Sequence, residues 1–556
     1  MLLADARLSA PASLATAQKI PVDGMPFADA LRIQLTAPGA QAWDAQIIAS
    51  TTGNIAPGDA LLLSLFVRGS SPTSETNEAR ATAYLQRSSG DFAKFITAPL
   101  TAGPAWRQYL VPVKAETTLA TGQHQFVIHL AYSAQTIEIG GISLLNYRNT
   151  IPLADLPRTK ITYPGQEPDA LWRAEADTRI DELRKANIQL TVTDSNGAPI
   201  PDAQVRVRMT RHEFGFGSAV AADGINNDGE KYRETIKELF NKVVLENDLK
   251  WPQWEQNRNR AQGALNWLRA NGITKVRGHN LVWPNWQYLP ADLQRLSANP
   301  AALRARILDH IAEEVSATRG QLVEWDVLNE PYTNTALQAI LGDQEMATWF
   351  KKAAEHDPQP TLYINDYSIL SGGGLDKPHQ DGYFNIIRKI IDGEAPLGGI
   401  GMQGHFGAQL TSVPKLWQIL DRFAEFKKPI HITEFDIDID DEEVQAAYTR
   451  DFLTAIFAHP SVDGFMMWGF WEGRHWRPRA AMFRKDWSRK PNADAFTGLV
   501  FNKWWTDETA ITDADGAINL RGFKGDYAID VSLGDITQST TASLTRDGLT
   551  MTITLP

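Results

Sequence analysis

The first 150 residues alternate between apolar and polar positions in short runs. Clear examples lie at 60–69, 78–87 and 125–133, and clusters of Gly, Pro, Ser and Thr separate them. A period of two is typical of strands that bury one face, and frequent turn residues between such runs favour two packed sheets. The pattern therefore predicts a β-sandwich over residues 1–150.

Residues 151–186 connect this sandwich to the rest of the chain. The stretch 151–172 is rich in Pro and has no clear periodicity, which predicts a linker. A short amphipathic helix is expected over 176–186. Two alternating runs then flank an Asn-Gly pair, so the sequence predicts a β-hairpin over residues 187–212.

From residue 213 apolar runs of strand length alternate with segments of helical periodicity, such as 299–317. This alternation is typical of βαβ units around a parallel sheet. The apolar runs lie at 214–220, 242–248, 275–283, 322–330, 361–367, 399–406, 429–437 and 464–470. Eight strands with helices between them predict an α/β fold, a (β/α)8 barrel over residues 213–505.

The tail, residues 506–556, returns to alternation and is rich in Gly, Thr and Asp. The two chain ends of a barrel usually emerge at the amino-terminal side of its strands. We therefore expect this C-terminal β-extension to join the hairpin of residues 187–212 in one small β-module, on the face opposite any active site.

Polar residues stand at the carboxyl ends of the predicted barrel strands, although buried parallel strands are almost wholly apolar. They are Glu246, Asn247, His279, Asn329, Glu330, Asn365, Asp366, Gln403, His405, Glu434 and Asp436. Any one of them could be an ordinary polar residue at a strand–loop junction. Six consecutive strands with such residues at one end indicate a shared site, because these ends converge on the active-site face of a barrel.

Glu330 and Glu434 end the fourth and seventh predicted strands. Hydrolysis of a glycosidic bond needs one carboxyl group to protonate the leaving oxygen and a second to attack the anomeric carbon or to activate water. In the expected fold His405 and Asp436 are close enough to Glu434 to keep it ionised. The amide of Asn329 is suited to hold a sugar hydroxyl. The pair of carboxyl groups predicts a glycoside hydrolase.

Composition narrows the possible partners. A formal net charge of −12 argues against nucleic acid and against an anionic membrane surface, and no apolar run is long enough for a membrane helix. The 17 Trp residues fit either a large core or stacking on sugars, and composition does not separate these uses. With 0 Cys, disulfides and thiolate chemistry are excluded.

No metal or cofactor is expected. The 11 His residues contain no HExxH or similar ligand pair. The acidic residues Asp438, Asp440 and Asp441 are more simply an exposed loop than a Ca²⁺ site.

Seven segments resemble glycoside hydrolase family 10, the family of endo-β-1,4-xylanases. They are LENDLKW (245–251), RGHNLVW (277–283), WDVLNE (325–330), INDY (364–367), GIGMQGH (399–405), ITEFD (432–436) and WGFWEGRHW (468–476), in the family's order and spacing. The resemblance covers residues 213–505. It implies a retaining hydrolase with Glu330 as acid/base and Glu434 as nucleophile, supported by Asn329, His405 and Asp436.

The resemblance also implies the residues that contact the substrate. They are Glu246, Asn247, Lys250, His279, Trp283, Asn365, Tyr367, Gln403, Trp468, Trp471 and Trp476. By the same resemblance, Glu246, Asn247 and Lys250 crowd the space that the hydroxymethyl group of glucose would need. This implication favours xylan and xylo-oligosaccharides as substrate.

Two segments depart from the family pattern. Pro284-Asn285-Trp286 stands where the family commonly has His-Ser-Gln, and Trp471 adds a bulky ring to the loop after the eighth strand. Both features resemble the plant-like branch of the family, as does the tail segment LRGFKGDYAIDV (520–531). These departures bear on the glycone subsites and leave the two glutamates unchanged.

Residues 1–150 loosely resemble the jelly-roll carbohydrate-binding modules attached to such enzymes, in WRQYLVPV (106–113) and QTIEIGGISLLNY (135–147). Trp43, Tyr84, Phe92 and Trp106 could form a sugar platform there or belong to the sandwich core.

The start of the chain, MLLADARLSAPASL, lacks the basic and apolar regions of a secretory signal. Because insoluble polysaccharide lies outside the cell, we expect a secreted or periplasmic protein whose signal is absent from this sequence, acting as a monomer.

Two other functions stay open. One is a different β-glycanase of the same barrel clan, acting on cellulose or mixed-linkage glucan. The other is a non-catalytic carbohydrate-binding protein.

Overall fold

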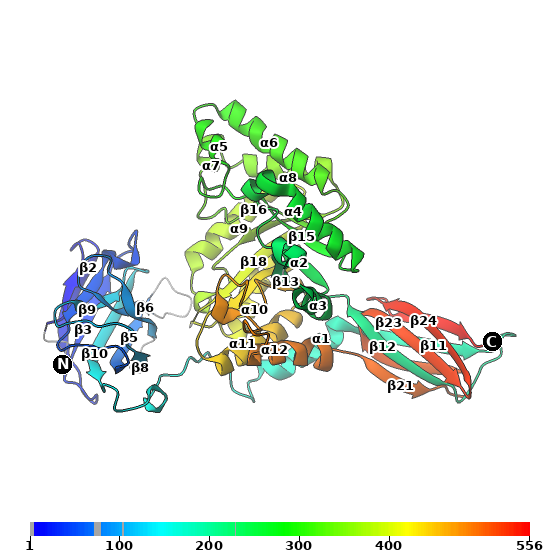
Figure 1. Ribbon diagram of the computed structural model, residues 1–556, viewed down its shortest axis with the longest axis horizontal. Coiled ribbons are helices and arrows are strands. Elements are labelled where there is room, and N and C mark those ends of the chain that lie inside the picture. Colours follow the sequence, from blue (N-terminus) through cyan, green and yellow to red (C-terminus); the bar gives the residue numbers. More distant parts are fainter. Residues whose placement is uncertain (1–4, 72–78, 103–104, 228, 408) are drawn as a thin grey trace. The chain divides into compact units, whose positions relative to one another are not determined.

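The computed structural model describes residues 5–71, 79–102, 105–227, 229–407 and 409–556 (Figure 1). The chain divides into two compact units, each described by itself below. The first comprises Met1–Ile161 with Leu375–Lys377, and the second comprises Thr162–Gly374 and Pro378–Pro556. Among the described helices, none has the length and apolar character needed to cross a membrane.

The first unit is a β-sandwich of two five-stranded sheets, which confirms the sequence prediction. One sheet has the order β1 (Arg7–Ser9), β4 (Gln46–Ser50), β9 (His124–His129), β6 (Ala79–Arg87), β7 (Lys94–Ala102), and the other β2 (Ala15–Pro21), β3 (Asp29–Leu35), β10 (Gln135–Asn146), β5 (Ala60–Ser70), β8 (Arg107–Lys114). Paired strands are antiparallel, and inward residues alternate with outward ones. Inward residues such as Ile47, Leu63 and Ile128 form one buried core between the sheets.

Eight parallel strands of the second unit close into a barrel, which confirms the predicted α/β fold. They are β13 (Gly215–Val220), β14 (Lys242–Leu245), β15 (Lys275–Val282), β16 (Glu324–Asn329), β17 (Thr361–Asp366), β18 (Gly399–Phe406), β19 (Ile430–Ile437) and β20 (Val462–Met467). Pairing of β13 with β20 closes the ring. Every predicted barrel strand is present, with ends that differ by a few residues.

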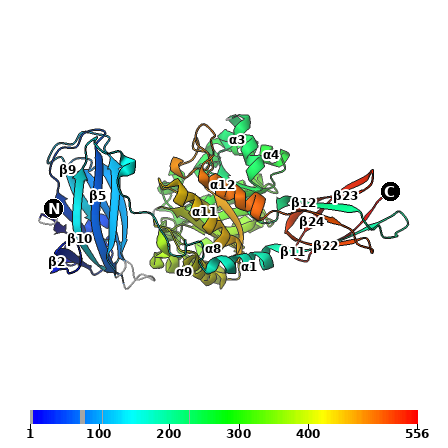
Figure 2. The same cartoon turned by 90° about the horizontal axis from the view of Figure 1, so that it is seen from below.

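Helices surround the barrel strands (Figure 1, Figure 2). They are α2 (Ala222–Asn227), α3 (Glu230–Leu239), α4 (Trp251–Ala270), α5 (Ala291–Arg295), α6 (Pro300–Ala317), α7 (Gln338–Leu341), α8 (Glu345–His356), α9 (Lys377–Asp392), α10 (Val413–Ala424), α11 (Glu442–Phe457) and α12 (Pro491–Gly498). The predicted helix at 299–317 is α6. The Asn299 side chain caps it by accepting a hydrogen bond of 3.2 Å from the Ala302 amide. Ile307 and Ile311 lie four residues apart on its buried face.

The helix α1 (Trp172–Arg184) precedes the barrel. It begins earlier than the predicted helix at 176–186 and also ends earlier, because Lys185 and Ala186 already belong to strand β11 (Lys185–Thr193).

The predicted hairpin over residues 187–212 is wrong in its pairing, although both of its strands exist. The two strands belong to different sheets. One sheet has the strand order β22 (Ala517–Phe523), β11, β25 (Leu549–Thr554). The other has the order β21 (Asp507–Ile511), β12 (Gln204–His212), β23 (Gly525–Leu533), β24 (Ile536–Leu544). The buried face of β11 includes Leu190, and that of β12 includes Val207. Because β11 and β12 lie in different sheets, their apolar faces can pack against each other. In a hairpin both strands would lie in one sheet, with these faces side by side. The small β-module built with the C-terminal tail is confirmed.

Arg184 joins this module to the barrel. Its guanidinium donates hydrogen bonds of 2.7 Å to the carbonyl of Phe457 and 2.8 Å to the carbonyls of His459 and Val462. Val462 is the first residue of β20. The module therefore lies at the amino-terminal end of the barrel strands, and the polar strand ends lie at the other.

Candidate active site

Glu330 directly follows β16 and has a left-handed backbone, with φ of +52°. This conformation is uncommon for a residue with a Cβ, and two hydrogen bonds hold it. The Glu330 amide donates to the carbonyl of Asn365 at 2.7 Å. The Asn334 side-chain amide donates to the Glu330 carbonyl at 2.9 Å. The backbone of Glu330 is thus fixed to strand β17 and to its own loop.

The carboxyl group of Glu330 is surrounded by neutral hydrogen-bond donors. The Trp283 indole donates to Oε2 at 3.1 Å, the Gln403 amide donates to Oε1 at 3.0 Å, and the Asn334 amide donates to Oε2 at 3.3 Å. Burial raises the pKa of Glu330 to about 7; the Gln403 amide opposes this shift, and the negative charge of Glu434 adds to it. Glu330 is therefore a carboxyl group that holds a proton close to neutral pH.

Glu434 lies within β19 and is 4% exposed. Its Oε1 accepts a hydrogen bond of 2.8 Å from the Asn365 amide, and its Oε2 lies 3.2 Å from His405 Nε2. His405 Nδ1 lies 2.9 Å from Asp436 Oδ2. Burial disfavours a charged His405, but the adjoining Asp436 and Glu434 carboxylates outweigh it and raise the His405 pKa to about 9. Glu434 thus faces a cation, whereas Glu330 faces neutral donors.

Asp436 is itself held in place from the loop after β20. The Trp476 indole donates to Oδ2 at 2.8 Å, and Arg477 donates to Oδ1 at 3.2 Å. The Arg477 guanidinium also lies 4.1 Å from the Trp476 ring centre. Trp476 is 50% exposed, so its ring has a free surface beside the His405–Asp436 pair.

Asn365 connects the two halves of the site. Its amide nitrogen donates to Asn329 Oδ1 at 2.9 Å and to Glu434 at 2.8 Å, and its oxygen accepts from the Thr433 hydroxyl at 2.7 Å. Asn365 is 0% exposed and both of its amide hydrogens are used. The sequence predicts that Asn365 contacts substrate, but this placement suits a residue that positions Glu434. Asn329 Nδ2, by contrast, has no partner among the described residues.

Lys250, which precedes α4, lies near both carboxyl groups. Its ammonium donates to Asn247 Oδ1 at 2.8 Å and lies 5.5 Å from the Trp283 ring centre. Burial lowers the pKa of Lys250, while the negative charges of Glu434 and Glu246 raise it. The predicted cluster of Glu246, Asn247 and Lys250 is therefore brought together beside the two glutamates.

His279, on β15, lies beneath the site and packs against Trp468, with ring centres 5.1 Å apart. Its Nδ1 lies 2.9 Å from Asp326 Oδ2. Arg277 donates to the same Asp326 oxygen at 2.9 Å. Sequence reasoning missed Asp326 and Arg277 because it searched the ends of strands. The available signal was two opposite charges in the middle of adjacent buried strands, where each needs a partner.

Two further predicted substrate residues contact other side chains of the loops and helices around the barrel. Trp471 stacks on Trp487, with ring centres 4.7 Å apart at 4°, and its ring lies 6.2 Å from that of Tyr232. The Tyr367 hydroxyl is 3.0 Å from Thr333 Oγ1. Trp471 therefore packs the loop after β20 against helix α3.

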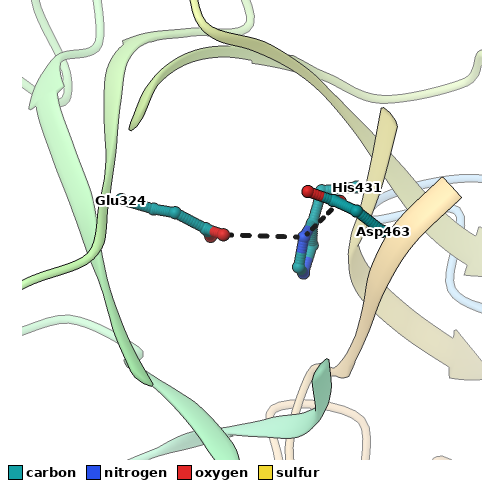
Figure 3. A group of neighbouring side chains, drawn as sticks. All are labelled: Glu324, His431 and Asp463. Atoms are coloured by element: carbon teal, nitrogen blue, oxygen red, sulfur yellow. Dashed lines mark ion pairs between the residues drawn. The ribbon is translucent and has the colours of Figure 1, made fainter. Parts of the chain in front are cut away.

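A second polar cluster lies at the amino-terminal end of the barrel. Glu324, His431 and Asp463 place one ligand atom each within 4.8 Å of one another, as a metal site would (Figure 3). The Lys242 ammonium, however, is hydrogen-bonded to Glu324 and lies 3.4 Å from His431 Nδ1. A cation of the protein already fills this position, so the cluster does not suit a metal ion.

A barrel with a pair of carboxyl groups at the ends of its fourth and seventh strands defines the class of (β/α)8-barrel glycoside hydrolases. The family model described as "Glycosyl hydrolase family 10" matches residues 207–499, just over half of the 556-residue chain. The chain belongs to glycosyl hydrolase family 10.

The chain is also similar to curated relatives and to solved structures. "Anti-sigma-I factor RsgI6" of Acetivibrio thermocellus is 32% identical over 385 residues, covering 68% of this chain and 49% of the relative. "Endo-1,4-beta-xylanase 1" of Arabidopsis thaliana is 29% identical over 356 residues, covering 63% of this chain and 37% of the relative. The chain thus spans half or less of the length of these relatives. Native xylanase 10B from Thermotoga maritima, a solved structure, is 26% identical with a TM-score of 0.48, covering 52% of this chain and 96% of that one.

Proposed function

We propose that this protein hydrolyses the β-1,4 bonds within xylan by a retaining double displacement. The observation that carries the proposal is the unequal setting of the two carboxyl groups. Glu330 has neutral donors and a pKa of about 7, and Glu434 lies against the His405–Asp436 pair. Glu330 can therefore give up a proton near neutral pH, and the cationic His405 faces the Glu434 carboxylate, as a general acid and a nucleophile require.

In the first step the Glu434 carboxylate attacks the anomeric carbon while Glu330 gives its proton to the glycosidic oxygen. The bond to the leaving sugar breaks, and an ester between Glu434 and the remaining sugar forms. In the second step the Glu330 carboxylate takes a proton from water, and the resulting hydroxide oxygen bonds to the anomeric carbon. The ester breaks, Glu434 regains its charge, and the product keeps the original anomeric configuration.

The neighbouring residues supply binding. Asn329 Nδ2 is a buried donor without a protein partner among the described residues, so a sugar hydroxyl near the attacked carbon would satisfy it. Glu246, Asn247 and Lys250 hold the adjacent sugar on the non-reducing side. They leave little room for a hydroxymethyl group, which favours xylose over glucose. The exposed ring of Trp476 covers the glycone side.

A non-catalytic carbohydrate-binding protein is the second candidate, because one relative is named as an anti-sigma factor rather than as an enzyme. Glu330, Glu434, His405 and Asp436 are all present with the contacts described above, so the site favours catalysis.

The proposal has three finer parts: the protein is secreted or periplasmic, it acts as a monomer, and its first unit binds carbohydrate.

A product profile on xylan, arabinoxylan, cellulose and mixed-linkage glucan tests the proposal. We expect short xylo-oligosaccharides from the first two substrates and little release from the others, with the β-anomer formed first in ¹H NMR. Preferred release of cello-oligosaccharides would indicate the other β-glycanase activity. Absence of any product would indicate the binding protein.

A further inference from the structure

Trp251 is the last residue of the segment LENDLKW and makes no contact with the two glutamates among the interactions described above. It directly follows Lys250, is the first residue of helix α4 and is 2% exposed. Its indole donates a hydrogen bond of 2.8 Å to Glu255 Oε1, one turn along the same helix. A buried Trp is commonly part of a core, so its other contacts decide whether it also supports the site.

His310 of helix α6 packs on the ring of Trp251. The two rings are stacked, with centres 3.8 Å apart and planes at 3°, which is van der Waals contact. Arg306, one turn earlier on α6, lies 5.2 Å from the Trp251 ring centre and donates to Glu255 Oε1 at 2.6 Å. Helix α6 therefore fixes the ring of Trp251 through two side chains.

The same histidine is bonded to a barrel strand. Its Nε2 donates to the Leu281 carbonyl of β15 at 3.1 Å. The pairing of β15 with β16 is irregular between His279 and Val282, and Leu281 lies in this interval. A buried carbonyl at such a break needs a donor from outside the sheet. His310 supplies it, two residues before Trp283.

His310 makes these contacts as an uncharged ring. Burial lowers its pKa to about 3. Glu314, on the next turn of α6, is 0% exposed, and its Oε2 lies 3.3 Å from His310 Nε2. Neither Glu314 oxygen has a hydrogen-bond partner among the described residues. Burial and the negative charges of Glu313 and Glu255 raise the pKa of Glu314 well above its ordinary value. The two groups are therefore both neutral, and an uncharged Glu314 leaves the Nε2 hydrogen to the Leu281 carbonyl.

Trp251 and Leu281 each stand next to a residue of the site. Lys250 precedes Trp251, and its ammonium lies 5.5 Å from the ring centre of Trp283, two residues after Leu281. Helix α4 and strand β15 are thus in contact at the mouth of the barrel through Lys250 and Trp283, and outside the ring of strands through His310. A side chain that contacts both elements limits how far they can move apart.

We propose that His310 is a positioning residue of the glycone site, which holds Lys250 in place through its stack on Trp251, while its bond to Leu281 fixes the ring. The proposal rests on the proposed function for the role of Lys250, which holds the sugar on the non-reducing side of the attacked one. His310 is 3% exposed and lies on a helix outside the strands, so it does not touch substrate itself.

Two activated substrates separate this role from a general loss of structure. An aryl β-xyloside fills only the position of the attacked sugar, whereas an aryl β-xylobioside adds the sugar beside Lys250. The ratio of kcat/KM for the bioside to kcat/KM for the xyloside measures what the added sugar contributes. The fraction of folded enzyme cancels in this ratio, because both substrates are measured on one preparation. Neither leaving group needs a proton, so the ratio does not depend on the acid Glu330.

Two variants of His310 separate the stack from the hydrogen bond. His310→Gln keeps a donor but loses the flat ring, and we expect it to lower the ratio about tenfold, chiefly through KM of the bioside. His310→Phe keeps a ring on Trp251 and loses the donor, so a fall of only about twofold to threefold is expected. Glu314→Gln, neutral like the protonated acid, is expected to keep the parental ratio. Ile311→Ala, on the buried face of the same helix, is the matched control, which lowers stability and leaves the ratio unchanged.

Lys250→Met gives the reference value, because it removes the group through which His310 is proposed to act. Adding His310→Gln to Lys250→Met is expected to lower the ratio no further. If His310→Gln does not fold, Trp251→Phe takes its place. This variant keeps a buried ring but loses the bond to Glu255, and we expect the ratio to fall roughly threefold.

The outcomes distinguish this inference from the proposed function. If Lys250→Met lowers the ratio while His310→Gln and Trp251→Phe keep the parental value, the role of His310 is wrong and the proposed function stands. An equal fall in Ile311→Ala, or a further fall in the double variant, would also overturn the role of His310, since its effect would then not pass through Lys250. If Lys250→Met itself keeps the parental ratio, Lys250 is not part of the glycone site, and that part of the proposed function falls together with the inference.

Discussion

The two ends of the barrel both bury charged side chains, but they surround them differently. Toward the amino-terminal end, the two buried carboxylates of β16, Glu324 and Asp326, each contact a cation. Glu324 pairs with Lys242 and with Arg277, the latter at 2.8 Å, and Asp326 accepts two hydrogen bonds from Arg277. At the carboxyl end, Glu330 has only uncharged donors within hydrogen-bond distance among the described residues.

This difference reverses the effect of burial on the pKa. Burial by itself would raise the pKa of Glu324, but Lys242, His431 and Arg277 together outweigh it and hold that pKa below its ordinary value. For Asp326, Arg277 and His279 together do the same. For Glu330 nothing outweighs burial, and its pKa rises to about 7. The paired carboxylates of β16 thus stay charged beside their cations, whereas Glu330, which has no cation at hydrogen-bond distance among the described residues, is available for proton transfer.

Removing Glu434 gives the largest expected effect. Glu434→Ala is expected to lower kcat on xylan on the order of 10⁴-fold or more, because the attacking group is lost. Azide added to this variant is expected to restore cleavage of an activated aryl xyloside and to give the inverted glycosyl azide, which NMR identifies. Asp440→Ala is the matched control, since this carboxylate is an exposed partner of Arg479 in the next loop. A Glu434→Ala protein with the parental rate would exclude the assignment.

Breaking a pair at the other end is expected to cost stability. Arg277→Met leaves the buried carboxylates of Glu324 and Asp326 without that cation, so the free energy of unfolding is expected to fall by about 3–5 kcal/mol. Urea unfolding followed by tryptophan fluorescence measures this fall in the barrel transition. Arg206→Met removes an exposed pair with Asp507, and its effect on the free energy of unfolding is expected to be far smaller. If both variants lowered the free energy of unfolding equally, the buried pairs of Arg277 would not stabilise the barrel more than an exposed pair does.

Most of the barrel and both glutamates were predictable from the sequence, for a physical reason. A buried parallel strand is so uniformly apolar that Glu330 and Glu434 stand out at its end. The pairing of β11 and β12 was not predictable, because alternation fixes which face of a strand is buried and not which sheet contains it. The role of Asn365 was equally hidden. A polar residue at a strand end looks the same whether it faces the substrate or lies beneath a carboxylate.

The pKa of Glu330 gives the next prediction. Because this pKa is raised from 4.5 to about 7, the native state holds the proton more tightly than the unfolded chain does. The free energy of unfolding therefore contains a contribution from Glu330 that falls as pH rises from 4.5 to 7 and is fully lost above 7. On the same grounds kcat/KM for xylan is expected to fall about tenfold per pH unit above about pH 7, since the acid is then ionised.

Glu330→Gln separates these two readouts. The variant is expected to lose about 10²–10⁴-fold in rate on xylan and much less on aryl xylosides, whose leaving groups need no proton. Its stability is expected to lack the decline between pH 4.5 and 7, as measured by thermal unfolding at several pH values. The variant is also measured on a substrate with a poor leaving group. If its kcat/KM then still falls above about pH 7 as it does in the parent protein, the general acid is another residue.

The smallest expected effect concerns Asn334, a residue that the sequence did not mark. Asn334 donates to Glu330 Oε2 at 3.3 Å, and its own oxygen accepts from the Asn285 amide at 2.8 Å. Asn285 belongs to the Pro284–Trp286 segment that departs from the family pattern, so this chain supports its acid with a local arrangement of its own.

Asn334→Ala removes a donor that favours the ionised carboxyl group, and the basic limb of kcat/KM is therefore expected to move to higher pH. The rate at the optimum is expected to fall only a few-fold, since Trp283 and Gln403 still bond to Glu330. Asn285→Ala is expected to shift the limb in the same direction by less, because Asn334 keeps its bond to the Glu330 carbonyl. If both variants lower the rate without shifting the basic limb of kcat/KM, these two residues position the loop and do not affect the pKa of Glu330.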